Sequence, residues 1–372
     1  MPAGDPLRHL EAALAELSRR DLLRNATGAP PTSSALLNLC SNDYLGYSAD
    51  PWPDAQQRGG AGASRLVSGT DPAHDHAEQT LASWLGTESA LLFSSGYAAN
   101  VGTLAALAGP GDLICSDALN HASLVDGCRL SGATIQVIAH RDLSALERAL
   151  TEGTPVRRRW VVTESYFSMD GDSPDLPALR ALCTRHDAAL IVDEAHALGV
   201  FGPHGRGLCA EASVTPDVLI GTAGKSLGLQ GAFVAGSTVL RTWLWNRARS
   251  FVFSTAISPA LAGAIATRAA RAAADDAGRA RLRALEAQLR HGLARLRVPG
   301  ILDGRGPIFP WIVGEPSAAL ALSGSLRDQG VLVQAIRPPT VPAHTSRLRI
   351  TVHAGLTSTD VERALAAFQA CC

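Results

Sequence analysis

The stretch Gly221-Thr222-Ala223-Gly224-Lys225-Ser226-Leu227-Gly228 contains the only lysine of a 372-residue chain in which 33 residues are Lys or Arg. Arginine serves as well as lysine in surface ion pairs, but only lysine loses its proton near neutral pH and attacks a carbonyl carbon. The alternative is a surface lysine that survived a compositional bias. The position of Lys225 in a glycine-rich turn, directly after the apolar run Val218–Ile220, favours a partly desolvated, reactive amine.

Around this turn, strand-like and helix-like patterns alternate from about residue 73 to residue 220. Short and almost continuous apolar segments indicate strands buried on both faces, which is typical of a parallel sheet between helices. The predicted strands are Ala90–Phe93, Leu113–Cys115, Thr134–Ile138, Trp160–Thr163, Leu190–Val192 and Val218–Ile220, with a further strand at Phe233–Gly236. Helices are predicted at 73–86, 97–107, 121–131, 142–152 and 175–186. We therefore predict an α/β fold with a mostly parallel central sheet.

Both ends of the chain differ from this alternating region. An amphipathic helix is predicted at 7–24, from the stripe of Leu7, Leu10, Leu14 and Leu17. A helix-breaking segment follows at 29–34, and a short strand is predicted at Leu36–Leu39. Residues 258–297 are rich in Ala and Arg and predicted helical, with Gly263 and Gly278 as weak points. Strands near 309–313, 331–333 and 347–352 and a final helix capped at Ser358-Thr359-Asp360 complete a smaller α+β unit.

These patterns divide the chain into three parts. We predict an N-terminal helix and arm at 1–40, a large domain at 41–270 and a C-terminal α+β domain at 271–372. A chain of this length exceeds one ordinary core, which favours a large domain with a smaller one.

The composition argues against several classes of protein. A net charge of −1 and an isoelectric point near 6.8 do not support a nucleic-acid or membrane partner. No apolar run reaches the roughly 20 residues that span a bilayer, and the N-terminus lacks the pattern of a secretion signal. The seven cysteines are scattered and form no C-x-x-C pair. We therefore expect reduced thiols, no metal site and a cytoplasmic location, with no function for Cys371 and Cys372.

Polar residues follow several of the predicted strands, at the edge where ligands bind in parallel sheets. Ser94-Ser95-Gly96-Tyr97 opens a helix after the first strand, and a helix N-terminus with small residues suits a phosphate. Asp193-Glu194-Ala195-His196 follows another strand. A lysine amine, a phosphate cradle and a carboxylate match the aldehyde, the phosphate and the ring nitrogen of pyridoxal 5'-phosphate. Asp193 could instead cap a helix, and His121 and His196 could be ordinary capping or buried histidines.

An ordered set of motifs carries a family resemblance. It consists of Ser41-Asn42-Asp43-Tyr44-Leu45-Gly46, Ser64-Arg65-Leu66-Val67-Ser68-Gly69-Thr70, Ser95-Gly96-Tyr97, Asn120-His121-Ala122-Ser123, Phe167-Ser168-Met169-Asp170-Gly171-Asp172, Asp193-Glu194-Ala195-His196 and Gly224-Lys225. The set, from about residue 36 to 366, closely resembles the α-oxoamine synthases. These are fold-type I pyridoxal-phosphate transferases, which condense an amino acid with an acyl thioester and release CO2.

The resemblance implies a role for individual residues. Lys225 would bind the cofactor covalently, Asp193 would pair with its ring nitrogen and His121 would stack on the ring; these three are the expected catalytic residues. The other expected cofactor contacts are Ser168 and His196 near the phenolic oxygen, Ser95, Gly96, Tyr97 and Thr222 at the phosphate, and Ser254 and Thr255 from the second subunit of a homodimer. Asn42 would reach the substrate, Arg337 would bind the carboxylate of the amino acid, and Arg24 would be a second carboxylate contact.

The segment Ala335-Ile336-Arg337-Pro338-Pro339-Thr340-Val341-Pro342 resembles the branch of this family that acts in biotin biosynthesis. That branch implies L-alanine and a pimeloyl thioester as substrates, with coenzyme A or acyl carrier protein as the carrier. A glycine C-acetyltransferase, a fold-type I aminotransferase and a non-catalytic subunit remain alternatives. The sequence departs from the usual family pattern at Ser165-Tyr166, at Ala197-Leu198 and at Ala223, which leaves acyl-chain selectivity open.

Overall fold

The computed structural model describes residues 7, 9–24, 36–52, 58–152, 155–302 and 304–371. The predicted helix-breaking segment at 29–34 and Cys372 lie outside these residues. The observed N-terminal helix, α1, spans His9–Arg19 and is shorter than the predicted helix at 7–24. The side chains of Leu10, Leu14 and Leu17 on its apolar stripe are exposed. None of the described helices combines the length and apolar character that a membrane crossing requires.

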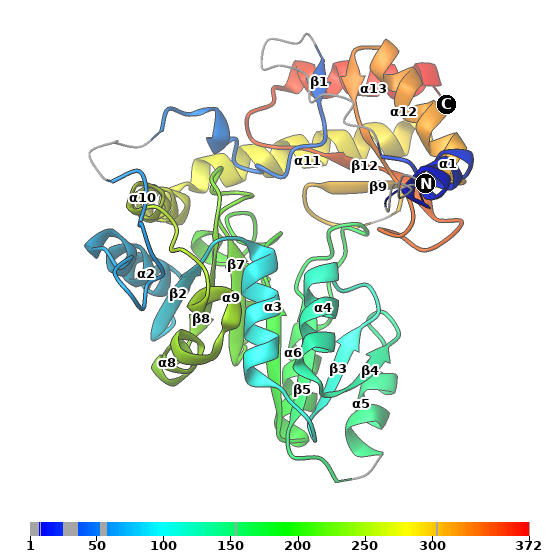
Figure 1. Cartoon of the computed structure of the whole chain (residues 1–372). Coiled ribbons are helices and arrows are strands. Elements are labelled where there is room, and N and C mark those ends of the chain that lie inside the picture. Colours follow the sequence, from blue (N-terminus) through cyan, green and yellow to red (C-terminus); the bar gives the residue numbers. More distant parts are fainter. Residues whose placement is uncertain are drawn as a thin grey trace, which may run out of the picture.

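A seven-stranded sheet forms the centre of the described chain (Figure 1). Its strands are β2 Ser89–Phe93, β3 Leu113–Asp117, β4 Thr134–Ile138, β5 Arg159–Glu164, β6 Ala188–Asp193, β7 Val218–Thr222 and β8 Ala232–Gly236, in the order β2-β8-β7-β6-β5-β3-β4. Only β8 runs antiparallel to its neighbours β2 and β7; β4, β3, β5, β6 and β7 pair in parallel. The predicted mostly parallel sheet is confirmed, and each strand predicted for this sheet lies within an observed one.

Helices connect the parallel strands and begin where a side chain caps them. The helices up to β6 are α2 Pro72–Leu85, α3 Gly96–Leu107, α4 Ala122–Ser131, α5 Leu143–Thr151 and α6 Leu176–Arg185. Asp71, Ser95, Asp142 and Asp175 accept hydrogen bonds from backbone N–H groups of the first turns of α2, α3, α5 and α6. The helices η1 Tyr47–Ala49, η2 Pro203–Gly205, α7 Leu208–Glu211, α8 Thr238–Arg247 and α9 Arg249–Val252 also belong to this region.

The predicted helical region 258–297 consists of two helices, α10 Pro259–Ala274 and α11 Asp276–Leu296. The break is at Asp275 and not at Gly263 or Gly278. Asp275 accepts a hydrogen bond from the Gly278 N–H at 2.8 Å and another from the Tyr47 hydroxyl at 2.7 Å. A side-chain cap anchored by a distant tyrosine therefore outweighs the local weakness of glycine in a helix.

The C-terminal part contains a three-stranded antiparallel sheet in the order β11-β12-β9. These strands are β9 Ile308–Gly314, β11 Gln334–Ile336 and β12 Ser346–Thr351, and the helices beside them are α12 Pro316–Asp328 and α13 Ser358–Cys371. The predicted strand at 331–333 does not join this sheet: β10 Val331–Leu332 pairs in parallel with β1 Leu37–Asn38. The cap of α13 is also one residue earlier than predicted, because Thr357 and Asp360 exchange side-chain and backbone hydrogen bonds.

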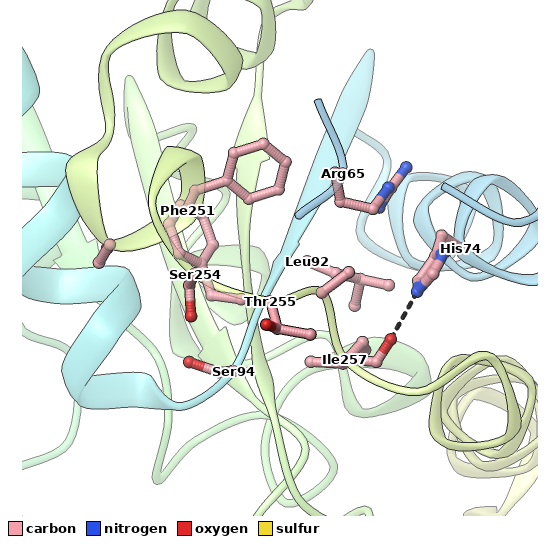
Figure 2. Close-up of a pocket in the computed structure, with 11 residues that line it drawn as sticks. Arg65, His74, Leu92, Ser94, Phe251, Ser254, Thr255 and Ile257 are labelled. Carbon is pink, nitrogen blue, oxygen red and sulfur yellow. Dashed lines mark hydrogen bonds between the residues drawn. The ribbon is translucent and has the colours of Figure 1, made fainter. Parts of the chain in front are cut away.

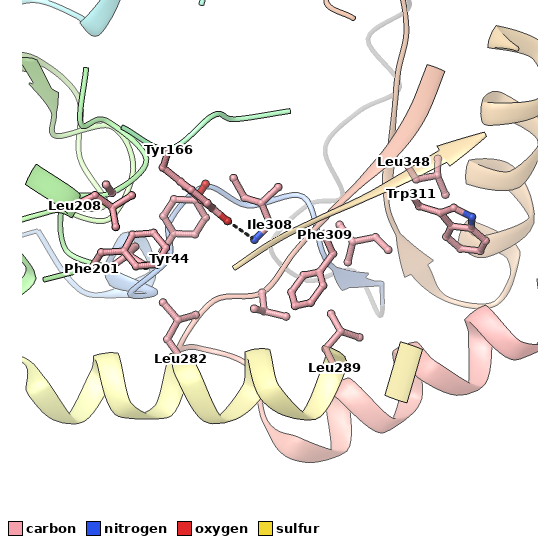
Figure 3. Close-up of a cluster of buried hydrophobic side chains, with 14 of the residues drawn as sticks. Tyr44, Tyr166, Phe201, Leu208, Leu282, Leu289, Ile308, Phe309, Trp311 and Leu348 are labelled. Carbon is pink, nitrogen blue, oxygen red and sulfur yellow. Dashed lines mark hydrogen bonds between the residues drawn. The ribbon is translucent and has the colours of Figure 1, made fainter. Parts of the chain in front are cut away.

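One apolar cluster extends from the central sheet to the C-terminal sheet (Figure 3). Tyr44, Tyr166 and Phe201 meet Leu282 of α11 and Ile308 of β9, and the Tyr166 hydroxyl accepts a hydrogen bond from the Ile308 N–H at 3.3 Å. The long helix α11 runs between the two parts of the molecule (Figure 1). This continuous core joins the two sheets, and the division at residues 41 and 271 stays a prediction.

Candidate functional site

The polar residues at the carboxyl ends of β5, β6 and β7 lie side by side. Glu164 ends β5, Asp193 ends β6, and the two are register partners across the parallel pair. Asp193 is in turn the partner of Ile220 in β7, and the turn that contains Lys225 begins after Thr222. Neighbouring strands are about 4.8 Å apart, so the sheet brings two carboxyl groups and one amine together.

Burial and charge determine the state of Lys225. Burial lowers the pKa of its ammonium group, and this effect exceeds the opposing attraction of Asp193 and Glu164; Arg349 lowers the pKa further. Among the described residues, none forms a hydrogen bond or ion pair with the Lys225 side chain. A larger fraction of this amine is therefore neutral near pH 7 than for an exposed lysine, as nucleophilic attack on a carbonyl requires.

The two buried carboxyl groups are held differently. Asp193 accepts hydrogen bonds from the Asn100 side chain and from the Ala195 backbone N–H, both at 2.8 Å. Glu164 accepts one from the backbone N–H of His121 at 2.6 Å, and its pKa is raised by burial and by the neighbouring Asp193. Because its pKa is raised to about 8, Glu164 holds its proton at neutral pH.

The N-terminus of α3 meets the end of β7. Ser95 caps α3 by accepting a hydrogen bond from Ala98 N–H at 3.1 Å. A methyl group added at Gly96 would lie 3.9 Å from the Thr222 Cβ, so Gly96 and Thr222 are neighbours. The Tyr97 side chain is half exposed, and its hydroxyl donates to Asp126 at 2.6 Å. The N-terminus of α3 beside the Thr222 hydroxyl is an arrangement that suits an anionic phosphate.

His121 and Ser168 line one cavity of about 680 Å³ between the central and C-terminal parts. His121 is the cap of α4, where its Nδ1 accepts a hydrogen bond from the Ser123 N–H at 3.3 Å. The other walls come from Phe167, Met169 and the 339–342 segment. The exposed ring of His121 therefore faces a space that is large enough for a cofactor with a substrate.

Arg349 of β12 is the basic group that reaches this site from the C-terminal part. Its guanidinium donates to Asn42 Oδ1 at 2.8 Å, to the Tyr44 hydroxyl at 3.2 Å and to the backbone oxygen of Ser168. The Tyr44 hydroxyl has one proton to donate, to Asn42 Oδ1 at 3.4 Å or to His196 Nδ1 at 2.7 Å, and the shorter contact favours His196. Burial and the positive charges of Lys225 and Arg349 lower the pKa of His196 well below its usual value, so the ring is neutral with its proton on Nε2.

Arg337 and Arg24 lie in a different cavity, of about 690 Å³, at the end of α1. Arg337 donates to the backbone oxygens of Asp21 and Leu23, and Arg24 donates to the Thr340 hydroxyl at 3.2 Å. Arg337 is not among the groups that shift the pKa of Lys225, whereas Arg349 is. The expected contact of Arg337 with the amino-acid carboxylate stays a prediction, and of the two arginines Arg349 is the one beside Lys225. The available signal for Arg349 was the alternation Arg347-Leu348-Arg349 in β12.

Ser254 and Thr255 line a small cavity with Ser94, Arg65 and His74 (Figure 2). His74 contacts the backbone oxygen of Ile257 at 2.8 Å, and Ala256 N–H donates to Ala63 O at 3.1 Å. The segments 63–67 and 253–257 are thus neighbours. The contacts of Ser254 and Thr255 with a second subunit stay a prediction.

The sequence reasoning missed Glu164, Asn100, Tyr44 and Arg349. Glu164 directly follows a predicted strand, as Asp193 does, and a carboxyl group in that place was its signal. Asn100 is in the middle of α3, and Tyr44 in a turn-forming motif. Nothing in their local sequence indicates that their side chains meet Asp193 and His196.

The sequence of this chain is similar to those of known enzymes. The sequence profile of the aminotransferase class I and II family matches residues 34–368. The 8-amino-7-oxononanoate synthase of Anaeromyxobacter dehalogenans is 48% identical over 345 residues, which are 90% of this chain and 86% of that protein. The enzyme of the same name from Marinobacter nauticus is 47% identical over the same shares of the two chains.

The chain belongs to the 8-amino-7-oxononanoate synthase family.

The solved structures show the same fold in this family's neighbours. Serine palmitoyltransferase from Sphingomonas wittichii superposes with a TM-score of 0.90 at 30% identity, covering 99% of this chain and 98% of that one. For a member of the 8-amino-7-oxononanoate synthase family, a fold shared with a serine palmitoyltransferase leaves the choice of amino acid and acyl group to the site residues.

Proposed function

We propose that this protein condenses L-alanine with a pimeloyl thioester, using pyridoxal 5'-phosphate, to form 8-amino-7-oxononanoate, CO2 and the free thiol carrier. The reaction is the one that gives 8-amino-7-oxononanoate synthases their name, and relatives of that name are 42–48% identical over 90–99% of this chain. The observation that carries the proposal is the half-buried Lys225 beside Asp193 and Arg349, whose side chain has no hydrogen-bond or ion-pair partner among the described residues. We expect the protein to work in the cytoplasm.

The residues present fit the cofactor. Lys225 supplies the amine for its aldehyde, Asp193 a buried carboxylate for its ring nitrogen, and Gly96 with Thr222 a corner for its phosphate. His121 offers its ring as a stacking face, and the Nε2 proton of His196 is a donor for the phenolic oxygen. When bound, the cofactor supplies an electron sink for the bonds at the amino-acid Cα.

The protein's own groups then orient and protonate the reactants. Arg349 is our candidate for the amino-acid carboxylate, because its guanidinium is buried at the site, and Asn42 and Tyr44 hold it from the other side. A fixed guanidinium selects the Cα bond that stands perpendicular to the ring plane. The neutral Lys225 amine is the group able to accept the Cα proton, and Asp193 keeps the ring nitrogen charged.

We assign the far carboxylate of the pimeloyl group to Arg24 and Arg337. Burial and the neighbouring Arg24 lower the pKa of Arg337, so two positive groups face each other and an anion between them would relieve the repulsion. Thr340 lines both this cavity and the one that contains His121. An acyl chain that reacts near Lys225 would therefore reach the two arginines past Thr340.

We also propose a homodimer. Val67 is 80% and Phe253 72% exposed, and Leu66 lies beside Val67 with 41% exposure. These side chains come from the two neighbouring segments 63–67 and 253–257. Large apolar groups gathered on one face suit burial against a second copy, which would also bring Ser254 and Thr255 to a neighbouring cofactor.

The function is tested with purified protein and a matrix of substrates. L-alanine with pimeloyl thioester, carried by coenzyme A or by acyl carrier protein, should release CO2 and thiol together. Glycine with acetyl thioester and L-serine with palmitoyl thioester should give less than about one hundredth of that rate, as expected when a carboxylate-binding pocket is left unfilled. Lys225→Ala should abolish turnover and the visible absorbance of the bound cofactor.

Borohydride treatment provides the control, because it fixes the cofactor on the lysine that holds it. Labelled cofactor should appear only in the peptide that contains Lys225. A colourless protein that takes up no cofactor, or amino-group transfer without CO2 release, would contradict the proposal.

A further inference from the structure

His140 lies outside the groups assigned above and bonds to two carboxylates. Its Nδ1 is 2.9 Å from Asp117 Oδ1 and its Nε2 is 3.0 Å from Asp172 Oδ2. An ionised carboxylate only accepts hydrogen bonds, so a ring that bonds to one through each nitrogen has to carry both protons. The distances therefore describe an imidazolium ion held between two aspartates.

The other charges around the ring support this state. Burial lowers the pKa of His140, but its hydrogen bonds with Asp117 and Asp172 outweigh burial and raise the pKa to about 9. Burial raises the pKa of Asp172, but His140 and Arg141 outweigh that effect and lower it. Arg141 donates to Asp172 at 2.8 Å. Among the described residues, Asp117 and Asp172 are the charged groups that shift the pKa of His140.

The ring holds a loop that also lines the cavity of His121. The rings of His140 and Phe167 pack at right angles, with centroids 4.4 Å apart and planes at 88°. The loop Phe167–Asp172 is closed by hydrogen bonds from Phe167 N–H to Asp172 O and from Gly171 N–H to Phe167 O, both at 2.9 Å. His140 therefore contacts both ends of this loop.

The opposite side of the same loop holds two arginines of β12. Arg347 donates to Met169 O at 3.0 Å and to Asp170 Oδ1 at 2.8 Å. Arg349 donates to the backbone oxygen of Ser168. The loop thus lies between the imidazolium on the central sheet and the arginine that we assign to the amino-acid carboxylate.

We propose that His140 is a positioning residue, an imidazolium clip that fixes the loop Phe167–Asp172 and through it the aim of Arg349 at the substrate carboxylate. The part of this inference that concerns the substrate rests on the proposed function. The contact of His140 with the loop Phe167–Asp172 involves only residues of this chain, and it can be measured without a substrate.

The first test is the protonation of the ring in the cofactor-bound protein. With 15N-labelled histidine, the signals that His140→Gln removes should show two protonated nitrogens at pH 7.5 and titrate with a midpoint near the pKa of about 9. A neutral His140 ring at pH 7.5 would overturn the proposal. Because the pKa is raised in the folded state, the stability from this charge is fully present below the unfolded pKa, about 6.5, and is lost as the pH rises through about 9.

The second test is the order of the loop. At pH 7.5, His140→Gln should speed hydrogen exchange of the Phe167 and Gly171 amides about 10-fold or more, while the exposed His291→Gln should leave it unchanged. Unchanged exchange in His140→Gln, even with a lower melting temperature, would reduce His140 to a structural ion pair and overturn the proposal.

The third test is kinetic. His140→Gln should raise the KM for L-alanine about 10-fold with a smaller change in kcat and with the cofactor absorbance retained, and Asp170→Asn should act in the same direction from the other side of the loop. Faster hydrogen exchange of the loop amides without any change in the KM for L-alanine would contradict the link to Arg349. If L-alanine is no substrate for the wild type, the exchange and ring measurements still test the clip, so the two failures are distinguishable.

Discussion

At the scale of single residues, we assign the two substrate carboxylates to different arginines. The amino-acid carboxylate is assigned to Arg349, and the far carboxylate of the pimeloyl group to Arg337. Arg349 contacts Asn42 and Tyr44 at the Lys225 site, whereas Arg337 contacts the end of α1. Arg349→Ala should raise the KM for L-alanine about 10–150-fold, the value of a charge-assisted contact of about 1.5–3 kcal/mol, and Arg337→Ala should instead raise the KM for the pimeloyl thioester. Arg349→Lys should rescue poorly because the planar fork is lost. Steady-state kinetics with each substrate varied in turn measure both constants, and the opposite assignment of the two effects would refute ours.

At the scale of elements, the junction between α10 and α11 depends on one side chain. Asp275 caps α11 and binds the hydroxyl of the buried Tyr47. Asp275→Ala should lower the free energy of unfolding by about 1–3 kcal/mol, and Tyr47→Phe, which keeps the cap, by about 1 kcal/mol. Asp328→Ala, at an exposed position at the end of α12, is the control and should stay within about 0.5 kcal/mol. Denaturant titration measures all three, and an Asp275→Ala variant as stable as the control would show that the helices are held by packing alone.

At the scale of the whole molecule, the apolar face formed by segments 63–67 and 253–257 determines assembly. Val67→Asp should dissociate the proposed homodimer, since a charge would enter a buried interface, and should lower activity with it. Val239→Asp on α8 is a matched control, because Val239 is 79% and Val67 80% exposed in the single chain. Sedimentation measures the mass of each variant. A wild-type monomer with full activity, or a Val67→Asp protein that stays dimeric, would exclude this face as the interface.

The sequence by itself determined the features that depend on neighbouring residues. The strands, the start of a helix at Ser95, and the glycine-rich turn around Lys225 follow from local periodicity and capping, because burial and hydrogen bonding within one segment decide them. The same local logic predicted that Asp193, Lys225 and the start of α3 would meet, since the carboxyl ends of parallel strands share one edge of the sheet.

Only the tertiary structure decided which distant side chain completes that edge. Both Arg337 and Arg349 lie in the C-terminal part, and their sequence surroundings do not show which one faces Lys225. The antiparallel pairing of β12 with β9 turns Arg349 toward Asn42 and Ser168, while β11 presents Arg337 to the end of α1. Asp275 and Glu164 follow the same rule, because their roles arise from Tyr47 and from Asp193, and long-range packing sets those contacts.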